Sequence, residues 1–207
     1  MDSNQVEEQF NMRSNYSLSN SLVSADDSAL VIIDVQKHFI NKLGKKKGQL
    51  LVSRIGWLVE LAKMLDIPLI VTAEDIPSLG GIYPGLNKKL PPGLKVYNKM
   101  SFGLAAQPGI VRAVKRTKRK TMVLVGLETD VCVAHSALGL LKLGCKTVIV
   151  SDATGSPGAA HKAGMERVKN AGGIILPLKN LYYEWVRTVR KDTSIISRLG
   201  APDGIKL

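Results

Sequence analysis

Cysteine and histidine are both scarce in this chain of 207 residues. The two cysteines, Cys132 and Cys145, are too few for a disulfide framework, which favours a reducing compartment and predicts a cytoplasmic protein. The three histidines, His38, His135 and His161, are too scattered to indicate a metal cluster. The sequence therefore predicts neither a metal nor another cofactor.

Long apolar runs are also missing. No stretch is long enough to cross a bilayer, so we expect no membrane partner. Asp2, Glu7 and Glu8 precede any apolar run, which is not the pattern of a signal peptide. Aromatic residues make up 5% of the chain, whereas hydrophobic residues make up 45%. A folded core is therefore expected, and it must be built mainly from aliphatic side chains.

Acidic residues are too few to balance the basic ones, so the formal net charge is +12. Lysine and arginine gather at residues 44–47, 88–89 and 115–120, in predicted loops and helix ends. A basic chain can bind nucleic acid, and this remains an alternative. However, no zinc spacing, RNA-binding aromatic signature or helix-turn-helix accompanies these clusters. We therefore predict a solvated basic surface and no specific nucleic-acid partner.

The pattern along the chain predicts one α/β domain. Residues 1–26 are rich in Asn, Ser, Gln and Glu, which predicts an arm that is disordered or ordered only against a partner subunit. Residues 27–207 alternate buried strands with helices, so we expect a three-layer, doubly wound, mostly parallel six-stranded sheet of the Rossmann-like kind. The strands are expected at residues 29–34, 68–73, 95–98, 121–125, 147–151 and 173–178, and the helices at 48–65, 109–116, 131–143, 159–171 and 181–188.

One strand-to-helix turn places a cysteine where reactive thiols often occur. A β-branched apolar run ends at Gly126, and Thr129 or Asp130 is positioned to cap the helix that follows. Cys132 would lie in the first helical turn, where unpaired N–H groups favour a thiolate. The turn thus predicts a nucleophile, although a small cysteine packed under the helix would give the same pattern.

Ligands of such sheets bind beyond the carboxyl ends of the strands, where Asp34, Lys99 and Cys132 are expected to meet. A thiolate that attacks a carbonyl carbon needs its proton removed, and the leaving nitrogen needs a proton returned. Asp34 suits both transfers, and Lys99 suits electrostatic support. Each has a simpler interpretation, because Asp34 could cap a turn and Lys99 could be a solvated lysine.

Three ordered motifs between Ala29 and Trp185 resemble the isochorismatase-like cysteine hydrolases, a family related to N-carbamoylsarcosine amidohydrolase and nicotinamidase. They are Val31-Ile-Ile-Asp34-Val-Gln36-Lys-His-Phe39, Lys99 with Ser101-Phe102, and Gly126-Leu-Glu-Thr-Asp-Val-Cys132-Val133. The resemblance implies a Cys132–Asp34–Lys99 triad and a cis peptide between Leu127 and Glu128. It also implies backbone oxyanion donors at Glu128 and Cys132, and a homodimer or homotetramer.

Departures from particular members narrow the expected activity. Nicotinamidases of the family carry an Asp and two His ligands after the second strand, whereas residues 74–81 contain no histidine. Cys132 favours attack on a carbonyl, so we predict a metal-independent hydrolase of an amide, ureido or carbamoyl C–N bond. The alternatives are a vinyl ether hydrolase of the isochorismatase type and a non-catalytic binder of a small ligand.

The substrate pocket is harder to place from sequence. Glu74 ends the second strand and is a candidate to meet a polar substrate group, or else a surface carboxylate. Ile82, Tyr83 and Phe102 are candidates for apolar or stacking walls around a small-molecule substrate. Direct roles for His38 and His135 are less favoured than packing.

Overall fold

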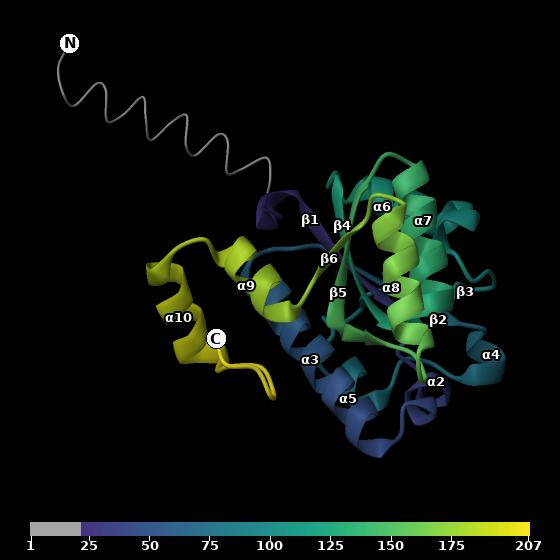
Figure 1. Ribbon diagram of the computed structural model, residues 1–207, viewed down its shortest axis with the longest axis horizontal. Coiled ribbons are helices and arrows are strands. Elements are labelled where there is room, and N and C mark those ends of the chain that lie inside the picture. Colours follow the sequence, from purple (N-terminus) through teal and green to yellow (C-terminus); the bar gives the residue numbers. More distant parts are fainter. Residues whose placement is uncertain (1–21) are drawn as a thin grey trace, which may run out of the picture.

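The computed structural model describes residues 22–207 (Figure 1). Most of the predicted arm, residues 1–21, lies outside this part of the chain. Residues 22–26, which were also assigned to the arm, pack against the domain. Val23 is buried, and its backbone N–H donates to the Glu184 carboxylate at 2.6 Å. A short 3-10 helix, η1 (Ala25–Asp27), then leads into the first strand.

Six strands form one sheet in the order β3-β2-β1-β4-β5-β6, and every neighbouring pair is parallel. This confirms the predicted doubly wound α/β fold. The chain starts in the middle of the sheet, winds to one edge and then returns to build the other half. The strands are β1 (Ser28–Ile33), β2 (Leu69–Glu74), β3 (Val96–Lys99), β4 (Thr121–Leu127), β5 (Lys146–Gly155) and β6 (Ile174–Leu176).

Helices cover both faces of the sheet (Figure 1). On one side lie α3 (Lys45–Met64) and α9 (Leu178–Val186), and on the other lie α6 (Pro108–Arg116), α7 (Ala134–Lys142) and α8 (Ala160–Asn170). Strand β1 shows why two layers are needed. Leu30 and Ile32 pack into one apolar cluster, whereas Ala29, Val31 and Ile33 pack into the other, and all five are fully buried. Burial of a large aliphatic side chain contributes about 1.5–3 kcal/mol, so both helical layers stabilise the central strand.

The helices include the five that the sequence predicts, together with others that it does not. They are α2 (Lys37–Lys42), α3 (Lys45–Met64), α4 (Ile76–Leu79), α5 (Pro84–Asn87), α6 (Pro108–Arg116), α7 (Ala134–Lys142), α8 (Ala160–Asn170), α9 (Leu178–Val186) and α10 (Val189–Leu199). Two single-turn segments complete the set, η2 (Leu104–Ala106) and the π-helical η3 (Thr129–Val133).

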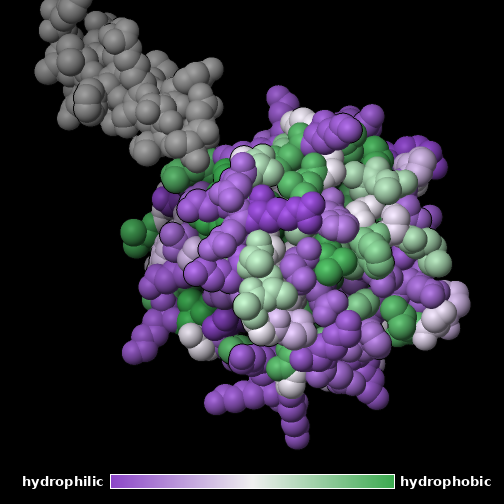
Figure 2. Space-filling view, turned by 45° about the vertical axis from the view of Figure 1, so that its right-hand side comes forward, coloured by the Kyte–Doolittle hydropathy of each residue, from purple (hydrophilic) through white to green (hydrophobic). Residues whose placement is uncertain are grey.

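The surface is predominantly hydrophilic on the face shown in Figure 2, with apolar groups in separate small areas. The predicted basic clusters lie at the surface, and the three lysines of residues 45–47 are all exposed. Within residues 22–207, no helix combines the length and apolar character needed to span a membrane. Phe102 and Met100 are among the exposed large apolar side chains, at 56% and 64% exposure.

Gly126 does not end strand β4 as the sequence suggested, because the strand continues to Leu127. The residue lies at a shift in register between β4 and β5, and its φ angle is 122°. A Cβ atom there would overlap the backbone of Ile33 on β1, including its carbonyl oxygen. Glycine is therefore required for the close approach of the two central strands.

Replacement of this glycine should be costly. We expect Gly126→Ala to lower the free energy of unfolding by more than about 2 kcal/mol, because strained backbone and backbone overlap act together. Chemical denaturation measures the change. Gly81→Ala is the matched control, since no atom lies within 4 Å of the position that its Cβ would take. Equal stabilities for the two variants would contradict this account of β1 and β4.

Candidate active site

The carboxyl ends of four segments bring four reactive side chains together. Asp34 directly follows β1, Glu74 ends β2, Lys99 ends β3, and Cys132 lies in η3 after β4. Parallel pairing aligns them, since Glu74 and Lys99 are register partners. The site therefore lies where a doubly wound sheet binds its ligands, next to the point where β1 separates the two halves.

The Lys99 ammonium group is the centre of this cluster. Its side chain is fully buried, and Nζ lies 3.0 Å from Asp34 Oδ2 and 3.3 Å from Glu74 Oε2. It also donates to the Ser101 carbonyl at 2.8 Å and lies 3.6 Å from Cys132 Sγ. Burial opposes the charge, but Asp34 first and then the other two groups raise the pKa of Lys99. The alternative of a solvated lysine is therefore wrong.

Asp34 is a buried carboxylate that lies between a hydroxyl group and an ammonium group. Thr72 Oγ1 donates to Asp34 Oδ1 at 2.9 Å, whereas Oδ2 has the ionic contact with Lys99 but accepts no hydrogen bond from any described residue. Burial raises the pKa of Asp34, and Lys99 only partly opposes this. A carboxylate with a raised pKa is a better proton acceptor than a solvated one. Its side chain does not cap a turn.

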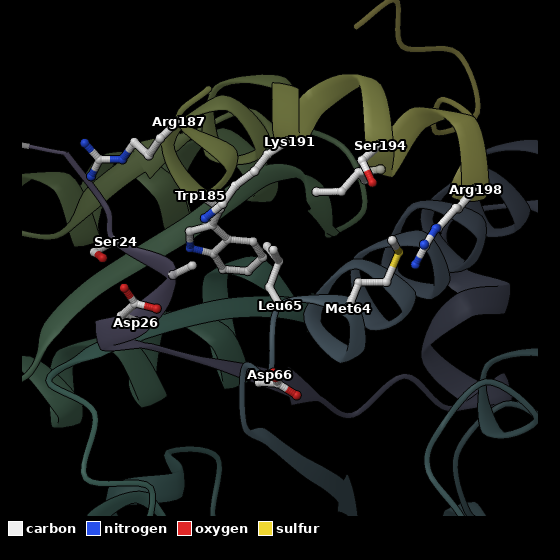
Figure 3. Close-up of a pocket in the computed structure, with 12 residues that line it drawn as sticks. Ser24, Asp26, Met64, Leu65, Asp66, Trp185, Arg187, Lys191, Ser194 and Arg198 are labelled. Carbon is white, nitrogen blue, oxygen red and sulfur yellow. The ribbon is translucent and has the colours of Figure 1, made fainter. Parts of the chain in front are cut away.

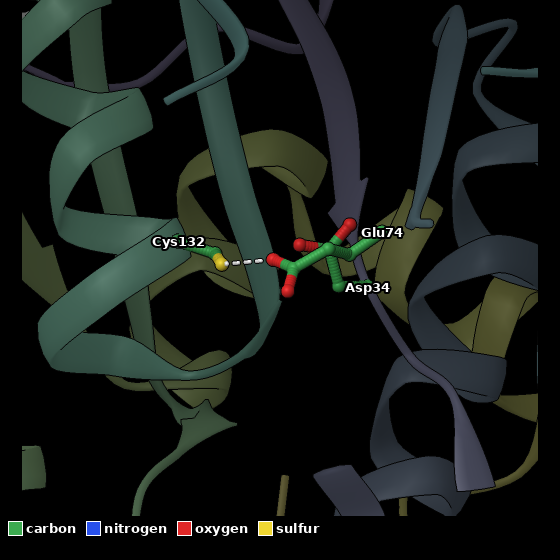
Figure 4. Close-up of side chains that lie close together, drawn as sticks. All are labelled: Asp34, Glu74 and Cys132. Carbon is green, nitrogen blue, oxygen red and sulfur yellow. Dashed lines mark hydrogen bonds between the residues drawn. The ribbon is translucent and has the colours of Figure 1, made fainter. Parts of the chain in front are cut away.

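The Cys132 thiol is 2% exposed and donates to Glu74 Oε2 at 3.0 Å, as the dashed line in Figure 4 shows. Burial raises its pKa most, Asp34 and Glu74 raise it further, and Lys99 opposes them. The resting thiol is therefore protonated. The expectation that the helix terminus would favour a thiolate is wrong for this state, because desolvation and two carboxylates outweigh one ammonium group.

The turn before Cys132 also differs from the predicted N-cap. Glu128 occupies the N-cap position of η3. Thr129 Oγ1 lies 2.8 Å from His161 Nδ1, and Asp130 Oδ1 accepts from Ser156 at 2.6 Å. Neither side chain caps the helix, because each has a partner on the β5–α8 connection or on α8. The peptide bond between Leu127 and Glu128 is cis, the isomer that the family resemblance implies.

Gln36 positions Glu74, and sequence reasoning assigned it no role. Its Nε2 donates to the carbonyl groups of Glu74 at 2.7 Å and Gly80 at 2.6 Å, and its Oε1 accepts from the Glu74 N–H at 2.8 Å. The buried amide thus ties the end of β2 to the turn after α4. The sequence feature that could have indicated this role is the position of Gln36 two residues after Asp34 in the first motif.

The other pocket candidates lie in different surroundings. Ile82 is buried in the core on the α3 side of the sheet, and the Tyr83 N–H donates to the Val35 carbonyl at 2.8 Å. The exposed Phe102 ring lies 6.2 Å from the His135 ring, edge to face. His38 is exposed beside Phe39. Roles for these residues in substrate binding remain predictions.

The cluster contains three groups that can ligate metals, but their surroundings do not suit a cation. The ligand atoms of Asp34, Glu74 and Cys132 all lie within 4.8 Å of one another. The Lys99 ammonium already lies beside each of them, at 3.0–3.6 Å. A metal ion would face this fixed positive charge at short range. None of the histidines, all within the described residues, joins the group.

Cavities of about 410, 350 and 330 Å³ lie away from the reactive cluster, the last of them beside Tyr97 and Arg116. The one in Figure 3 measures about 410 Å³ and is lined by residues such as Asp26, Asp66, Trp185 and Lys191. Asp26 and Asp66 precede β1 and β2, so this cavity lies at the amino ends of the strands, opposite the reactive edge. A second cavity of about 350 Å³ is lined by His161 and the end of β5.

Fold and site together define a class. It is the doubly wound α/β proteins that carry a thiol, a carboxylate and a lysine at the carboxyl edge of the sheet. Residues 28–179 match the family model described as the isochorismatase domain, so the chain belongs to the isochorismatase family, whose members are hydrolases.

Relatives from distant organisms share this domain. The chain is 29% identical over 162 residues to the secreted isochorismatase effector Isc1 of Phytophthora sojae, and covers 76% of each chain. It is 26% identical over 178 residues to the probable hydrolase YcaC of Escherichia coli, covering 84% of this chain and 85% of that protein.

Solved structures show the same fold. The crystal structure of Escherichia coli YcaC, described as an octameric hydrolase of unknown specificity, has a TM-score of 0.79 at 23% identity, covering 86% of this chain and 89% of that one. The MAR1 ribonuclease of Caenorhabditis elegans has a TM-score of 0.76 at 23% identity, covering 90% and 98%. Likeness at this level of identity concerns the fold alone.

Loss of the buried ammonium should destabilise the protein in a pH-dependent way. We expect Lys99→Met to lower the free energy of unfolding by about 3–5 kcal/mol at pH 7, because Asp34 and Glu74 lose their counter-ion. The pKa of Asp34 is already raised and should rise further in the variant. Above that pKa the folded variant must hold an ionised Asp34 without a counter-ion, which costs stability. The loss in the free energy of unfolding should therefore become smaller as the pH falls and Asp34 is protonated.

Denaturant unfolding between pH 5 and pH 8 measures this dependence. Lys63→Met is the matched control, because Lys63 forms an exposed ion pair with Glu60 at 2.9 Å. Such a pair contributes about 0–1 kcal/mol. A deficit in Lys99→Met that did not change with pH would argue against an unpaired Asp34 carboxylate as its cause.

Proposed function

We propose that this protein hydrolyses a C–N bond of a small amide, ureido or carbamoyl compound. Cys132 is the nucleophile, Asp34 the general base and then the general acid, and Lys99 the electrostatic support. The observation that carries the proposal is the buried meeting of a thiol, an aspartate and an ammonium group at the reactive edge of the sheet. The chemistry of acyl transfer through a thiol needs these three groups.

The first step follows from the protonated resting thiol. Asp34 Oδ2 lies 3.0 Å from the Lys99 ammonium, and the Asp34 carboxylate lies within 4.8 Å of Sγ. As the sulfur attacks the carbonyl carbon, its proton passes to Asp34 and a C–S bond forms. Lys99 stabilises the sulfur while negative charge develops on it, an effect that is strong in a dry site.

The tetrahedral oxyanion would be held by the backbone N–H groups of Glu128 and Cys132, as in the family that the motifs resemble. When the intermediate collapses, the C–N bond breaks and Asp34 returns its proton to the leaving nitrogen. The product on Cys132 is a thioester from an amide, or a thiocarbamate from a ureide. Water, deprotonated by Asp34, then releases the acid and restores the thiol.

The competing functions make different demands on the site. Cleavage of a vinyl ether by acid catalysis needs a proton donor but no thiol, so the placement of Cys132 beside Asp34 favours a carbonyl substrate. A non-catalytic binder of a small ligand would need no nucleophile either. Nucleic-acid binding has only the exposed basic clusters in its favour.

Assembly and location remain predictions. We infer a homo-oligomer, a dimer or tetramer as the resemblance implies; the octameric description of the Escherichia coli relative points to self-association in the family. A cytoplasmic location rests on the two free cysteines, whereas the Phytophthora relative is described as secreted.

Variants at the two reacting residues test the reaction. Purified protein is screened against amides, ureides, carbamoyl compounds and isochorismate, with product release as the measurement. We expect the wild type to hydrolyse a C–N substrate. The rate should fall by at least about 10³-fold in Cys132→Ala, which lacks the nucleophile, and in Asp34→Asn, which lacks the group that accepts and returns the proton. Cys145→Ala is the matched control and should retain activity, since Cys145 lies outside the cluster.

The outcomes separate the competing functions. Cleavage of isochorismate that survives Cys132→Ala would favour the vinyl ether mechanism. Thermal stabilisation by a small ligand without turnover would favour the binder. Amide hydrolysis that survives both substitutions would contradict the proposed mechanism.

A further inference from the structure

The Cys132 thiol donates a hydrogen bond to Glu74, with the Asp34 carboxylate also close by. Sγ lies 3.0 Å from Glu74 Oε2, and the same oxygen lies 3.3 Å from the Lys99 ammonium. Asp34 Oδ2, by contrast, accepts no hydrogen bond from the described residues. The resting site therefore holds its proton on sulfur and points it at a carboxylate that the proposed reaction does not use.

Glu74 is also the one member of the cluster that reaches the surface. Its side chain is 19% exposed, whereas the side chains of Lys99 and Asp34 are fully buried and Cys132 is 2% exposed. Glu74 is thus the member of the cluster that is most accessible to a molecule from solvent. Gln36 fixes the backbone of Glu74 at both its N–H and its carbonyl group. The carboxylate is thus presented from a rigid strand end.

We propose that Glu74 is the substrate-recognition residue of this site, and that it exchanges its hydrogen bond with the Cys132 thiol for one with a substrate N–H. The acyl substrate would then be an uncharged group with an N–H beside the attacked carbonyl, such as a primary amide or a ureide. A substrate with a carboxylate at that position would be rejected. This inference rests on the proposed function and names its substrate class.

The local charge supports this selectivity. Asp34 and Glu74 contribute two negative charges, Lys99 contributes one positive charge, and the resting thiol is neutral. The chain as a whole carries +12, so long-range attraction favours anions while the innermost site repels them. A carboxylate is also a strong acceptor for an N–H group, and its hydrogen bonds are about twice as strong as those of neutral acceptors.

The exchange would couple substrate binding to activation of the nucleophile. Once a substrate N–H occupies Glu74 Oε2, the S–H group is free to turn toward the Asp34 carboxylate. The proton then moves from sulfur to Asp34 as the C–S bond forms, and from Asp34 to the leaving nitrogen as the C–N bond breaks. Glu74 gains and loses no proton in this sequence.

A matched pair of alkylating reagents tests the selectivity without turnover. Iodoacetamide and iodoacetate have similar size and the same leaving group, but the first carries a neutral amide and the second a carboxylate. Mass spectrometry of digested protein gives the rate of each at Cys132 and, as an internal reference, at Cys145. We expect the amide-to-carboxylate rate ratio at Cys132 to exceed that at Cys145 by at least about tenfold, because only Cys132 lies beside Glu74.

Two variants assign the effect to Glu74. Glu74→Gln should reduce the ratio at Cys132 to near that at Cys145. Asp75→Asn is the matched control, since it removes the same charge from the next residue. Asp75 has a left-handed backbone conformation, which asparagine also tolerates. It should leave the ratio unchanged. Equal ratios at the two cysteines of the wild type, or no reaction of native Cys132 with either reagent, would overturn the proposal.

A second measurement separates recognition from a structural role. In Glu74→Gln we expect faster alkylation of Cys132 by both reagents, because the carboxylate that holds the proton on sulfur is gone. Hydrolysis of the amide or ureide substrate should nevertheless become less efficient by about tenfold in kcat/KM, mainly through KM. Slower alkylation together with slower hydrolysis would indicate a distorted site and contradict the proposal. Because alkylation needs no turnover, its outcome is independent of whether the proposed hydrolysis is correct.

Discussion

The buried ammonium group of Lys99 is the interaction on which the rest of the site depends. It is the sole cation that contacts the cluster among the described residues, and it lies within 3.6 Å of two carboxylates and a thiol. Without it, β1 and β2 would end in uncompensated carboxylates at a buried edge. With it, three strand ends and the turn after β4 are drawn to one point. The same ammonium group would repel a cation bound by Asp34, Glu74 and Cys132.

Backbone geometry determines how closely the strands that carry the site can approach one another. The strand order places β1 between β2 and β4, so Asp34 has Thr72 on one side and the Cys132 turn on the other. Gly126 lets β4 approach β1 more closely than any side chain would permit. Gln36 then ties the end of β2 to the loop beyond it. The positions of the reactive groups are consequently set by packed backbone, which suits chemistry that tolerates little displacement.

Sequence patterns predicted the parts of this molecule that depend on burial and on order along the chain. All six strands were predicted, the four central ones because they are largely buried and apolar, and the placement of Asp34, Lys99 and Cys132 followed from the parallel sheet. Helices α2, α4 and α5 were missed because segments of 6, 4 and 4 residues are too short to show a helical period, whereas α10, with 11 residues, is long enough and was missed nevertheless. The α10 helix also starts just after Arg187, whose left-handed backbone breaks the preceding helix, and such a turn is rarely signalled by arginine.

Side-chain partners were beyond the reach of those patterns. Thr129 and Asp130 are good capping residues, yet each has a tertiary partner that outweighs the local choice. The ionisation of Cys132 likewise depends on burial and on Glu74, which no spacing rule connects to the turn. Local chemistry at a helix terminus predicts a thiolate, whereas the three-dimensional charge balance predicts a thiol.

That balance gives the resting state a physical purpose. A permanently ionised thiolate would be open to any electrophile, whereas a buried thiol held by a carboxylate is inert until its hydrogen bond is replaced. In the proposed mechanism Asp34 is the second acceptor, and burial raises its pKa, which suits a group that takes and then returns a proton. The two carboxylates beside the thiol have separate tasks in the proposed mechanism: Glu74, the more exposed one, recognises the substrate, and the buried Asp34 transfers the proton. A single carboxylate could not perform both, because a group that is occupied by the substrate cannot at the same time accept the proton of the nucleophile.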